Sequence, residues 1–401
     1  MVKFWGYPRP DGRVGVRNLV AVIPSTYCAN TVARRIAAQV EGAVALPHDV
    51  GCSQVGLDLE ITARTLKNLG RHPNVAAVLV VGLGCERLAA TELAEGVAVS
   101  GKPVEVITIQ ESGGSLRALE RGSSVVRRLV QEASSLRREE VGLEHLAVAT
   151  ECGGTDAFSG IVANPAVGIA ADLVVAGGGT VMFSEINELL GTEHLLAGRA
   201  ANQEVAELIY KVIGLSESRL AWQSRNDRSG KRLALISTGN FDGGVSTLVE
   251  KGLGGMKKSG SSPIVGVLKY AECYSEPGLY LMDTPGHDAQ STSGMVAGGC
   301  QIVLFTTGRG TPTGHPIAPV IKITGNSHSF QKMLDNIDVN VGTVLDGEMT
   351  LREAGERIFQ QVLEVANGRQ TKAEVLGHDE LMSVWRPWPE HENAYGCGEW
   401  G

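Results

Sequence analysis

The sequence predicts an α/β protein of two Rossmann-like domains, each a doubly wound parallel sheet, with the active site between them. Short apolar runs alternate with stretches of helical periodicity almost from the N-terminus, which is typical of βαβ units and a parallel sheet. Aromatic residues make up only 5% of the chain and 51 residues are glycine, a composition that suits buried strands joined by tight turns. Because 401 residues exceed what one hydrophobic core usually organises, two domains are expected.

The first domain is expected over residues 1–140. Its apolar runs are interpreted as buried strands, and the stretches between them as amphipathic helices. The expected strands are Leu19–Pro24, Ala43–Pro47, Val75–Val81 and Val104–Ile109, and the expected helices are Thr31–Val40, Leu57–Leu69 and Leu116–Leu136. The charged stretch Leu136–Glu144 is expected to be a solvated boundary between the domains.

The second domain is expected over residues 141–401, where the same alternation resumes and an irregular tail follows from Trp385. The expected strands are Leu146–Ala149, Thr180–Phe183, Leu233–Ile236, Ile264–Leu268, Leu279–Met282, Ile302–Phe305 and Val320–Ile323. The expected helices are Pro165–Ala176, Glu193–Ile213 and Thr350–Ala366. The polar stretch Ser216–Gly230 is expected to be a surface connection.

The charge balance argues against nucleic acid as a partner. The net charge is -8 at pH 7 and no basic stripe is present, whereas phosphate binding needs clustered Lys and Arg. The first residues, MVKFWGYPRPDGR, lack the apolar core of a secretory signal, and no apolar run approaches the roughly 18 residues of a membrane span. We therefore expect a cytoplasmic protein without a membrane partner, whose cysteines are not structural disulfides.

Four of the seven cysteines follow predicted strands: Cys28, Cys52, Cys85 and Cys152. Function collects at the carboxyl ends of the strands in a doubly wound sheet, so these thiols are expected to face a shared crevice. Converging thiolates suit iron or zinc, either as a single ion or as an iron–sulfur cluster. No close pair such as CxxC is present, and four unrelated buried thiols are the alternative interpretation.

Polar side chains lie near the same strand ends. His48, Gln54, Glu86, Glu151 and Asp156 stand within a few positions of the cysteines, and the later loops carry Lys269, His287, Arg309 and Asn326. Arginine suits a carboxylate, and amides and hydroxyls suit sugar hydroxyls, although ordinary turns use the same residue types. No GxxxxGK[ST] motif is present and no GxGxxG motif opens a helix after the first strand, which argues against a nucleotide site.

Several long motifs resemble the altronate dehydratase/galactarate dehydratase family, over about Gly6 to Ile358. They are RPDGRVGVRN (Arg9–Asn18), CAN (Cys28–Asn30), PHDVGCSQVGLDLE (Pro47–Glu60), VVGLGCE (Val80–Glu86), TECGGTDAFSGIVANPAVGIAADL (Thr150–Leu173), EKGLGGMKKSG (Glu250–Gly260), GLYLMDTPG (Gly278–Gly286), MVAGGCQIVLFTTGRGTP (Met295–Pro312) and DNIDVNVG (Asp335–Gly342). The resemblance implies a hydro-lyase that uses ferrous iron and acts on hexonic or hexaric acids.

Two departures from the family pattern affect these expectations. His287 and His315 stand where related sequences tend to carry Asn, which indicates altered substrate contacts. The match begins almost at Met1, without the family's small N-terminal domain, so a separate small subunit is expected as a partner, within a homo-oligomer. The large subunit of a sulfolactate sulfo-lyase is similar and stays open as an alternative, as does a non-catalytic sugar-acid binding protein.

The expected reaction is dehydration of an altronate- or galactarate-like sugar acid to a 2-keto-3-deoxy acid. Iron is expected near Cys52, Cys85 and Cys152, with Cys28 as a fourth ligand or neighbour; the cofactor is Fe2+ or an iron–sulfur cluster. His48 is the first candidate for moving the proton, followed by Lys269 and His287, while Glu86 and Glu151 are candidate carboxylates of the catalytic site. The candidates for binding the substrate are Asn30, Gln54, Asp156, Arg309 and Asn326.

Overall fold

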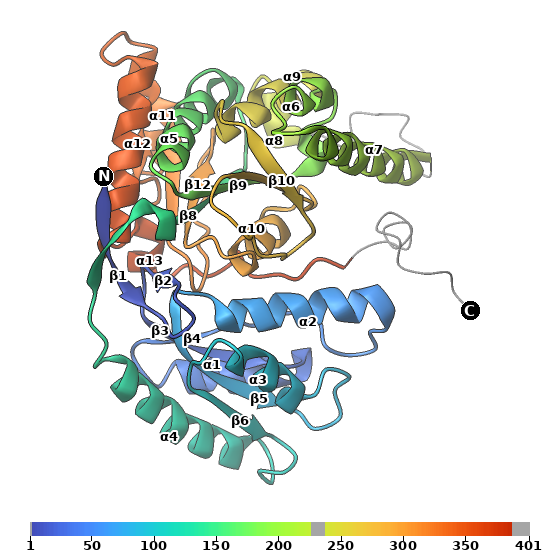
Figure 1. The fold of residues 1–401 in the computed structure, drawn as a ribbon, viewed down its shortest axis with the longest axis vertical. Helices are drawn as coiled ribbons and strands as arrows, with labels where there is room; N and C mark the ends of the chain where they lie inside the picture. The colour runs from blue at the N-terminus through green and yellow to red at the C-terminus, as the bar shows by residue number, and fades with distance from the viewer. Residues whose placement is uncertain (1, 226–236, 387–401) are drawn as a thin grey trace.

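A computed structural model describes residues 2–225 and 237–386. Within them the chain forms two parallel sheets of four and seven strands and a small antiparallel sheet (Figure 1). The predicted α/β class with parallel sheets is therefore confirmed. The predicted strand Leu233–Ile236 lies outside the described residues.

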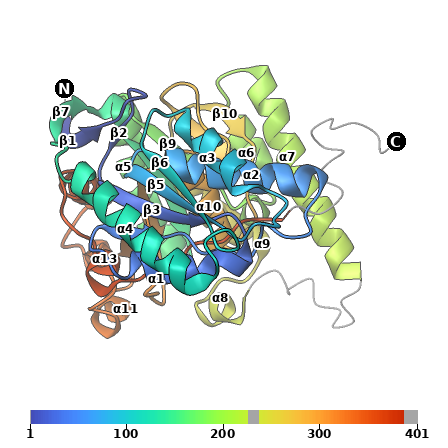
Figure 2. The ribbon, with the colours of Figure 1, turned by 90° about the horizontal axis from the view of Figure 1, so that it is seen from below.

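The four-stranded sheet has the order β4-β3-β5-β6, with every pair parallel. Its strands are β3 (Leu19–Pro24), β4 (Ala43–Ala45), β5 (Val75–Gly82) and β6 (Val104–Thr108). Helices α1 (Asn30–Ala37) and α4 (Ser115–Ala133) cover one face, and α2 (Gly56–Arg71) and α3 (Ala90–Ala98) cover the other (Figure 2). Because side chains alternate along a strand, Val20 and Val22 pack toward α1 and α4 while Ala21 and Ile23 pack toward α2.

The seven-stranded sheet has the order β10-β11-β9-β8-β12-β13-β14, again with every pair parallel. Its strands are β8 (Ala147–Cys152), β9 (Thr180–Phe183), β10 (Ile264–Leu268), β11 (Leu279–Met282), β12 (Ile302–Thr306), β13 (Val320–Thr324) and β14 (Val339–Asn340). Helices α5 (Asn164–Ala176), α7 (Gln203–Arg225) and α12 (Leu351–Ala366) cover one face, and α10 (Asp288–Ala297) covers the other.

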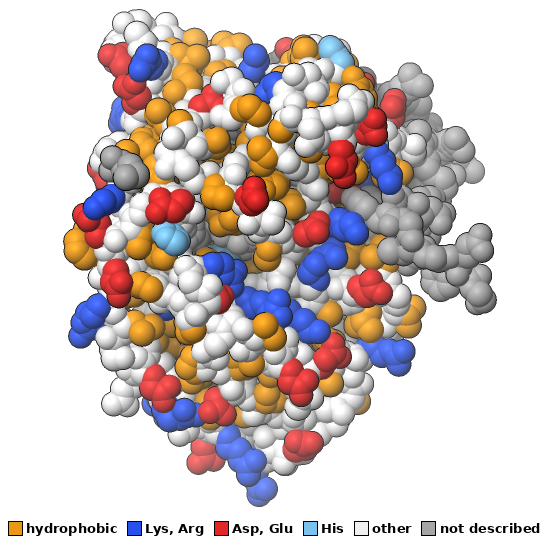
Figure 3. Space-filling view, viewed as in Figure 1, with side chains coloured by type: hydrophobic (Ala, Val, Ile, Leu, Met, Phe, Trp, Pro, Cys, Tyr) orange, Lys and Arg blue, Asp and Glu red, His pale blue; other side chains and the backbone are white. Residues whose placement is uncertain are grey.

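Helix α2 lies between the two parallel sheets (Figure 1). It packs against α10, and one continuous hydrophobic core contains residues of both sheets, such as Val80 and Val303, together with Tyr270 and Trp385. On the face of the molecule shown in Figure 3, Lys and Arg side chains are interspersed with Asp and Glu. The two sheets are therefore joined by apolar packing, while that face mixes charges of both signs.

The charged stretch Leu136–Glu144, predicted to be a solvated boundary, contains the short strand β7 (Glu139–Gly142), which the sequence analysis does not predict. This strand pairs antiparallel with β1 (Lys3–Pro8), which also pairs with β2 (Val14–Gly15). The polar side chains of β7 obscure the strand in the sequence, and its hydrogen-bonding partner lies at the other end of the domain.

The predicted helix Glu193–Ile213 is interrupted in the structure. It consists of α6 (Glu193–Ala197) and the start of α7, which continues to Arg225 and so includes much of the stretch predicted as a surface connection. Between the two helices, the backbone of Arg199 and Ala201 exchanges hydrogen bonds with Ile264 at the start of β10. This pairing with the edge of the sheet interrupts the helix, although the local periodicity of the sequence predicts one continuous helix.

The segment Ser159–Ala176 joins a π-helical turn (Ser159–Ala163) to α5. It is the one helical segment in the described ranges that is long and apolar enough to cross a membrane by composition, and 56% of it is buried inside the protein. Its buried residues pack against the seven-stranded sheet and α12, as expected of a core helix.

Other helices of this half of the chain lie among and after the strands of the large sheet. They are α8 (Thr238–Asp242), α9 (Leu248–Gly255), a 3-10 helix η6 (Met256–Ser259), α11 (Ser327–Lys332) and α13 (Lys372–Leu376). Both η6 and α9 contact the π-helical turn or α5, which brings their lysines next to the ends of the central strands.

Candidate active site

The strand order of the large sheet reverses between β8 and β12. The chain runs from β8 to β9 on one side, whereas β12 and the strands after it lie on the other side. At such a reversal the loops leave in opposite directions, and open α/β sheets bind ligands at the carboxyl ends of these strands. Glu151 and Cys152 are the last two residues of β8, so both lie at this point.

Cys152 is buried, and its thiol makes polar contacts with charged side chains. Its Sγ lies 3.4 Å from Nζ of Lys258 and 3.4 Å from a carboxylate oxygen of Glu188. Glu185 contributes a further oxygen at 3.8 Å from the thiol. Burial raises the pKa of the Cys152 thiol to about 11, and the ammonium of Lys258 offsets part of the rise.

Glu185 and Glu188 come from the loop after β9. Glu185 has a left-handed backbone with φ of 65°, a conformation that is uncommon for residues other than glycine and is frequent at functional sites. Its carboxylate accepts the backbone N–H of Cys152 at 3.2 Å and pairs with Lys258. Burial also raises the pKa of Glu188, against the opposing effect of the Lys251 ammonium.

Two lysines face these carboxylates from α9 and η6. Lys251 Nζ lies 2.5 Å from Oε1 of Glu188, while the fully buried Lys258 contacts Glu185 and Cys152. Gly168 of α5 allows η6 to approach closely, since a Cβ added there would lie 2.1 Å from the carbonyl oxygen of Lys257. The packing of η6 against α5 therefore positions Lys258.

Glu151 and Asp288 extend the group toward α10. Ser291 Oγ donates to Oε2 of Glu151 at 2.6 Å, while Oε1 of Glu151 has no hydrogen-bond partner in the described part of the chain. Burial raises the pKa of Glu151 to about 8; the Lys258 ammonium opposes this rise and the Asp288 carboxylate adds to it. Burial raises the pKa of Asp288 as well, whereas the adjacent His287 lowers it.

These residues fit a divalent metal ion. One ligand atom each from Cys152, Glu185 and Glu188 lies within 4.8 Å of the other two, and the same holds for Glu151, Glu185 and Asp288. A thiolate with several carboxylates is a donor set that suits iron among other divalent metals. The buried Oε1 of Glu151, which has no hydrogen-bond partner among the described residues, indicates that this group can accept a further cation.

A cavity of about 270 Å³ adjoins this group. It is lined by Asp156, Lys251, Lys257 and residues of the π-helical turn, a type of distortion that is frequent at functional sites. Asp156, which the sequence predicts to bind substrate, accepts hydrogen bonds from Ser159 through Oδ1 and from Asn326 Nδ2 through Oδ2, at 3.0 Å. The structure thus brings together two of the predicted binding residues, Asp156 and Asn326, at the ends of β8 and β13.

The other predicted residues of the large sheet are exposed. Arg309 follows β12 and its guanidinium lies 3.3 Å from Asp242. Lys269 follows β10, and its backbone N–H donates to Glu272. His287 precedes α10 and lies directly before Asp288, which belongs to the buried group. All three stay candidates, at the same carboxyl edge of the sheet as Cys152.

The loops with Cys28, Cys52 and Cys85 lie at the carboxyl ends of the smaller sheet. These loops contact one another, because Tyr27 N–H donates to Val50 and Ser25 Oγ donates to Glu86. All three cysteines are exposed. In the described residues, Cys152 makes its polar contacts with the charged group and Thr155 and with none of these three thiols.

His48, Asn30, Gln54 and Glu86 brace these same loops. Nε2 of His48 contacts the carbonyl oxygen of Pro24 at 2.7 Å and Nδ1 accepts the N–H of Val50, so neither ring nitrogen is left for a substrate proton in this arrangement. Burial lowers the pKa of His48. Asn30 bonds the backbone of His48, and Gln54 accepts the N–H of Gly51. For Glu86, burial raises the pKa, but bonds from Gly84 and Ser25 outweigh it and the pKa is lowered.

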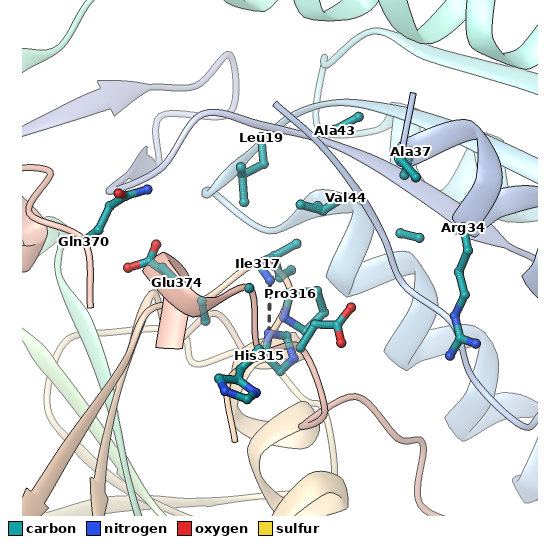
Figure 4. Close-up of a pocket in the computed structure, with 16 residues that line it drawn as sticks. Leu19, Arg34, Ala37, Ala43, Val44, His315, Pro316, Ile317, Gln370 and Glu374 are labelled. Carbon is teal, nitrogen blue, oxygen red and sulfur yellow. Dashed lines mark hydrogen bonds between the residues drawn. The ribbon is translucent and has the colours of Figure 1, made fainter. Parts of the chain in front are cut away.

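A larger cavity, of about 440 Å³, lies away from these strand ends (Figure 4). Leu19, Ala43 and Val44 of the smaller sheet form one wall, and the segment from His315 to Ile317 forms the opposite wall. His315 is buried, and its Nδ1 accepts the N–H of Ile317. The cavity therefore lies between the two sheets, beside the start of β3 and of β13.

Sequence reasoning missed Glu185, Glu188, Lys251, Lys258 and Asp288. A signal existed for Glu185, which lies shortly after the predicted strand Thr180–Phe183, as Cys152 lies shortly after the predicted strand Leu146–Ala149. Both lysines lie in the motif EKGLGGMKKSG, but nothing in the spacing indicates which of its lysines are buried. Their role depends on how α9 and η6 pack against the sheet.

The fold is that of an α/β protein that carries a buried group of acid, base and thiol side chains at the ends of its strands. Two family models cover most of the chain: the D-galactarate dehydratase/altronate hydrolase second domain at residues 6–134, and the D-galactarate/altronate dehydratase C-terminal domain at residues 143–389. The chain belongs to the galactarate/altronate dehydratase family.

Curated relatives of similar sequence are lyases. The beta subunit of (2R)-sulfolactate sulfo-lyase of Chromohalobacter salexigens is 40% identical over 380 residues, which cover 94% of this chain and 96% of the relative. Altronate dehydratase of Bacillus subtilis is 35% identical over 94% of this chain and 76% of its own length. Galactarate dehydratase (L-threo-forming) of Escherichia coli is 36% identical over 96% and 77%. The chain is thus an enzyme of the lyase kind.

Proposed function

We propose that this protein is a hydro-lyase that dehydrates a sugar acid of the altronate or galactarate type to a 2-keto-3-deoxy acid. The observation that carries the proposal is the buried group around Cys152 at the strand reversal, with a cavity beside it that Lys251 and Asp156 line. Dehydration requires removal of the proton next to the carboxylate and protonation of the departing hydroxyl. Groups of raised pKa and a charged lysine beside the cavity suit both needs.

Ferrous iron is the proposed cofactor, and Cys152, Glu185 and Glu188 are the residues that would hold it. Bound there, the ion would act as a Lewis acid on a substrate oxygen. An iron–sulfur cluster, or a role for Cys28, Cys52 and Cys85, is the alternative that the sequence leaves open. The single thiol among the carboxylates of the Cys152 group supports one ion in preference to a cluster at this position.

The chain's own residues supply the remaining chemistry in this proposal. Lys251 lines the cavity and stays charged, since its pKa is raised: burial opposes the charge but Glu188 outweighs it, so its ammonium can hold the substrate carboxylate. Glu151, whose pKa burial raises to about 8, is the proposed donor of a proton to the leaving hydroxyl. His287 is the proposed base, because it is the candidate that adjoins the buried group through Asp288.

The substrate is expected to occupy the 270 Å³ cavity, with Asp156 and Asn326 contacting its hydroxyl groups and Arg309 its second anionic end. We further propose that the enzyme is cytoplasmic and forms a homo-oligomer with a separate small subunit. The proposal of a small subunit is supported by the name of the sulfo-lyase relative, which is a beta subunit.

A sulfolactate sulfo-lyase is the second candidate, favoured by the relative that is 40% identical and matches in length. It would remove the same proton but expel sulfite. Sulfolactate carries a sulfonate in addition to its carboxylate, and galactarate likewise carries a second carboxylate, so the two candidate reactions differ in the group that leaves.

Protein purified without oxygen and supplied with ferrous iron would be incubated with altronate, galactarate and (2R)-sulfolactate, with and without a candidate small subunit. Formation of a 2-keto-3-deoxy acid without sulfite is the expected result. Release of sulfite from sulfolactate alone would replace the first proposal by the second. Glu151→Gln should lose turnover of the true substrate, which separates catalysis at this site from a contaminating enzyme.

A further inference from the structure

Lys258 is one of the largest fully buried side chains in the described part of the protein, with 1% of its surface exposed. Its Nζ donates to Sγ of Cys152 at 3.4 Å and pairs with Oε2 of Glu185. A buried ammonium is costly unless an anionic partner compensates it, and the carboxylate of Glu185 is that partner.

The partners of Lys258 are two of the three residues that can hold a metal. Ligand atoms of Cys152, Glu185 and Glu188 lie within 4.8 Å of one another, and the ammonium contacts the first two residues. A divalent ion held by the same sulfur and oxygen atoms would lie within a few ångströms of Nζ, where two positive charges repel each other strongly. Metal and lysine cannot both use these ligands.

Lys251 contacts fewer of the candidate metal ligands than Lys258 does. Among the described residues it pairs with Glu188, and it lines the cavity, so it would compete with a metal ion for one of the three ligands. The buried group contains four carboxyl groups, on Glu151, Glu185, Glu188 and Asp288, against the two lysines.

Glu151 offers Lys258 a second position. Its Oε1 is buried and has no hydrogen-bond partner in the described ranges, and ligand atoms of Glu151 and Glu185 lie within 4.8 Å of each other. A rotation of the flexible lysine side chain spans such a distance. The unpaired Oε1 of Glu151 is thus explained if the ammonium of Lys258 donates to it when a metal ion is bound.

We propose that Lys258 is an internal cation that competes with a metal ion for Cys152 and Glu185, and that metal uptake moves it from these two residues to Glu151. The inference rests on the metal site of the proposed function and adds a regulatory step to it. Lys258 lowers the affinity of the site for metal, and Glu151 restores part of it by receiving the displaced ammonium.

Cobalt(II) is a suitable probe, because a cysteine thiolate bound to it gives a near-ultraviolet absorption that reports the ligand directly. Metal-free protein would be titrated with Co2+ and its dissociation constant compared with that of Lys258→Met. The variant should bind Co2+ about tenfold or more tightly, with the thiolate absorption retained, since the competing charge is gone. Lys332→Met, which removes an exposed lysine on α11, should bind like the wild type.

Glu151→Leu should weaken Co2+ binding several-fold in the wild type and have no such effect in the Lys258→Met background, because no ammonium then needs an acceptor. Unchanged or weaker binding by Lys258→Met would overturn the inference, as would absence of the thiolate absorption from wild-type protein. Lys258→Gln keeps a hydrogen-bond donor to Glu185 and serves if the methionine variant does not fold.

The outcome is independent of the substrate. Lysine-dependent Co2+ affinity without dehydratase activity would leave this inference standing and overturn only the proposed reaction. Dehydratase activity together with a Co2+ affinity that does not depend on Lys258 would overturn this inference and leave the proposed reaction standing.

Discussion

Ser291 on α10 donates a hydrogen bond to Oε2 of Glu151 at 2.6 Å, across the crevice between two central strands and the helix that covers them. The same hydroxyl lies 2.7 Å from that of Ser184 after β9 and 3.1 Å from that of Thr284 after β11. The carboxyl group of Glu151 is therefore oriented by Ser291 of α10, whose hydroxyl contacts residues at the ends of β9 and β11. This geometry makes Ser291 a direct test of the buried group.

Ser291→Ala should leave both oxygens of Glu151 without a partner and lower the free energy of unfolding by about 1–3 kcal/mol. Because the serine bond favours the charged carboxylate, the loss should be greater at pH 9 than at pH 6, on either side of the pKa of about 8. Denaturant unfolding of metal-free protein at the two pH values measures this. Ser135→Ala, on the exposed surface, is the control, and an equal loss at both pH values would contradict the assigned role.

The cysteines can be separated by single substitution to serine. Cys152→Ser should lose about tenfold or more of the iron affinity, since the thiolate is the softest ligand of the buried group. Cys300→Ser, at another fully buried position, should keep its iron. Iron content after anaerobic reconstitution is the measurement. Loss of iron from Cys28→Ser, Cys52→Ser and Cys85→Ser, with none from Cys152→Ser, would show that the metal binds at the smaller sheet.

His315 should make the protein sensitive to acid. Burial lowers its pKa to about 3, whereas an unfolded histidine titrates near 6.5. As the pH falls below 6.5, the unfolded state binds the proton first, so stability present at pH 7 is lost progressively down to about pH 3. The contribution of this one residue is on the order of a few kcal/mol.

His315→Asn should therefore flatten the loss of stability between pH 6.5 and pH 4. Asparagine can accept the N–H of Ile317 in the same way, so the backbone contact is retained while the titrating group is removed. Melting temperatures across this range measure the effect. His287→Asn, at an exposed position, is the matched control, and equal acid sensitivity of both variants would contradict the prediction.

Substitution by alanine should change the free energy of unfolding in opposite directions at two helical glycines. Gly168→Ala should cost about 2–3 kcal/mol because the added Cβ would lie 2.1 Å from the carbonyl oxygen of Lys257 and push η6 away from α5. Gly214→Ala in α7 meets nothing within 4 Å and should stabilise by about 0.5–1 kcal/mol through helix propensity. Urea unfolding compares the two, and Co2+ affinity should change only for Gly168→Ala, which displaces Lys258. A stable Gly168→Ala variant would show that η6 is free to shift.

The sequence predicted most of the parallel strands to within a few residues. Leu19–Pro24, Thr180–Phe183 and Leu279–Met282 coincide with β3, β9 and β11, because buried parallel strands are continuous apolar runs that local pattern reveals. It missed β7 and the break between α6 and α7, since both depend on pairing with distant strands. The local periodicity of a sequence does not indicate which distant strands will pair.

The sequence singles out Glu151 and Cys152 because they follow a predicted strand, and the structure places both in the buried group. The two cations and three further carboxyl groups come from a loop, two helical turns and the start of α10, and their burial is set by packing.

By itself, the sequence determined the α/β class, the strand-end location of the thiols and the family, because apolar periodicity and long motifs are local properties of the chain. Only the tertiary structure decided that Cys152 contacts glutamates and lysines in place of the other three cysteines. Contacts between segments up to 106 residues apart arise from how helices pack on the sheet, and the desolvation that perturbs their charges exists only once that packing has formed.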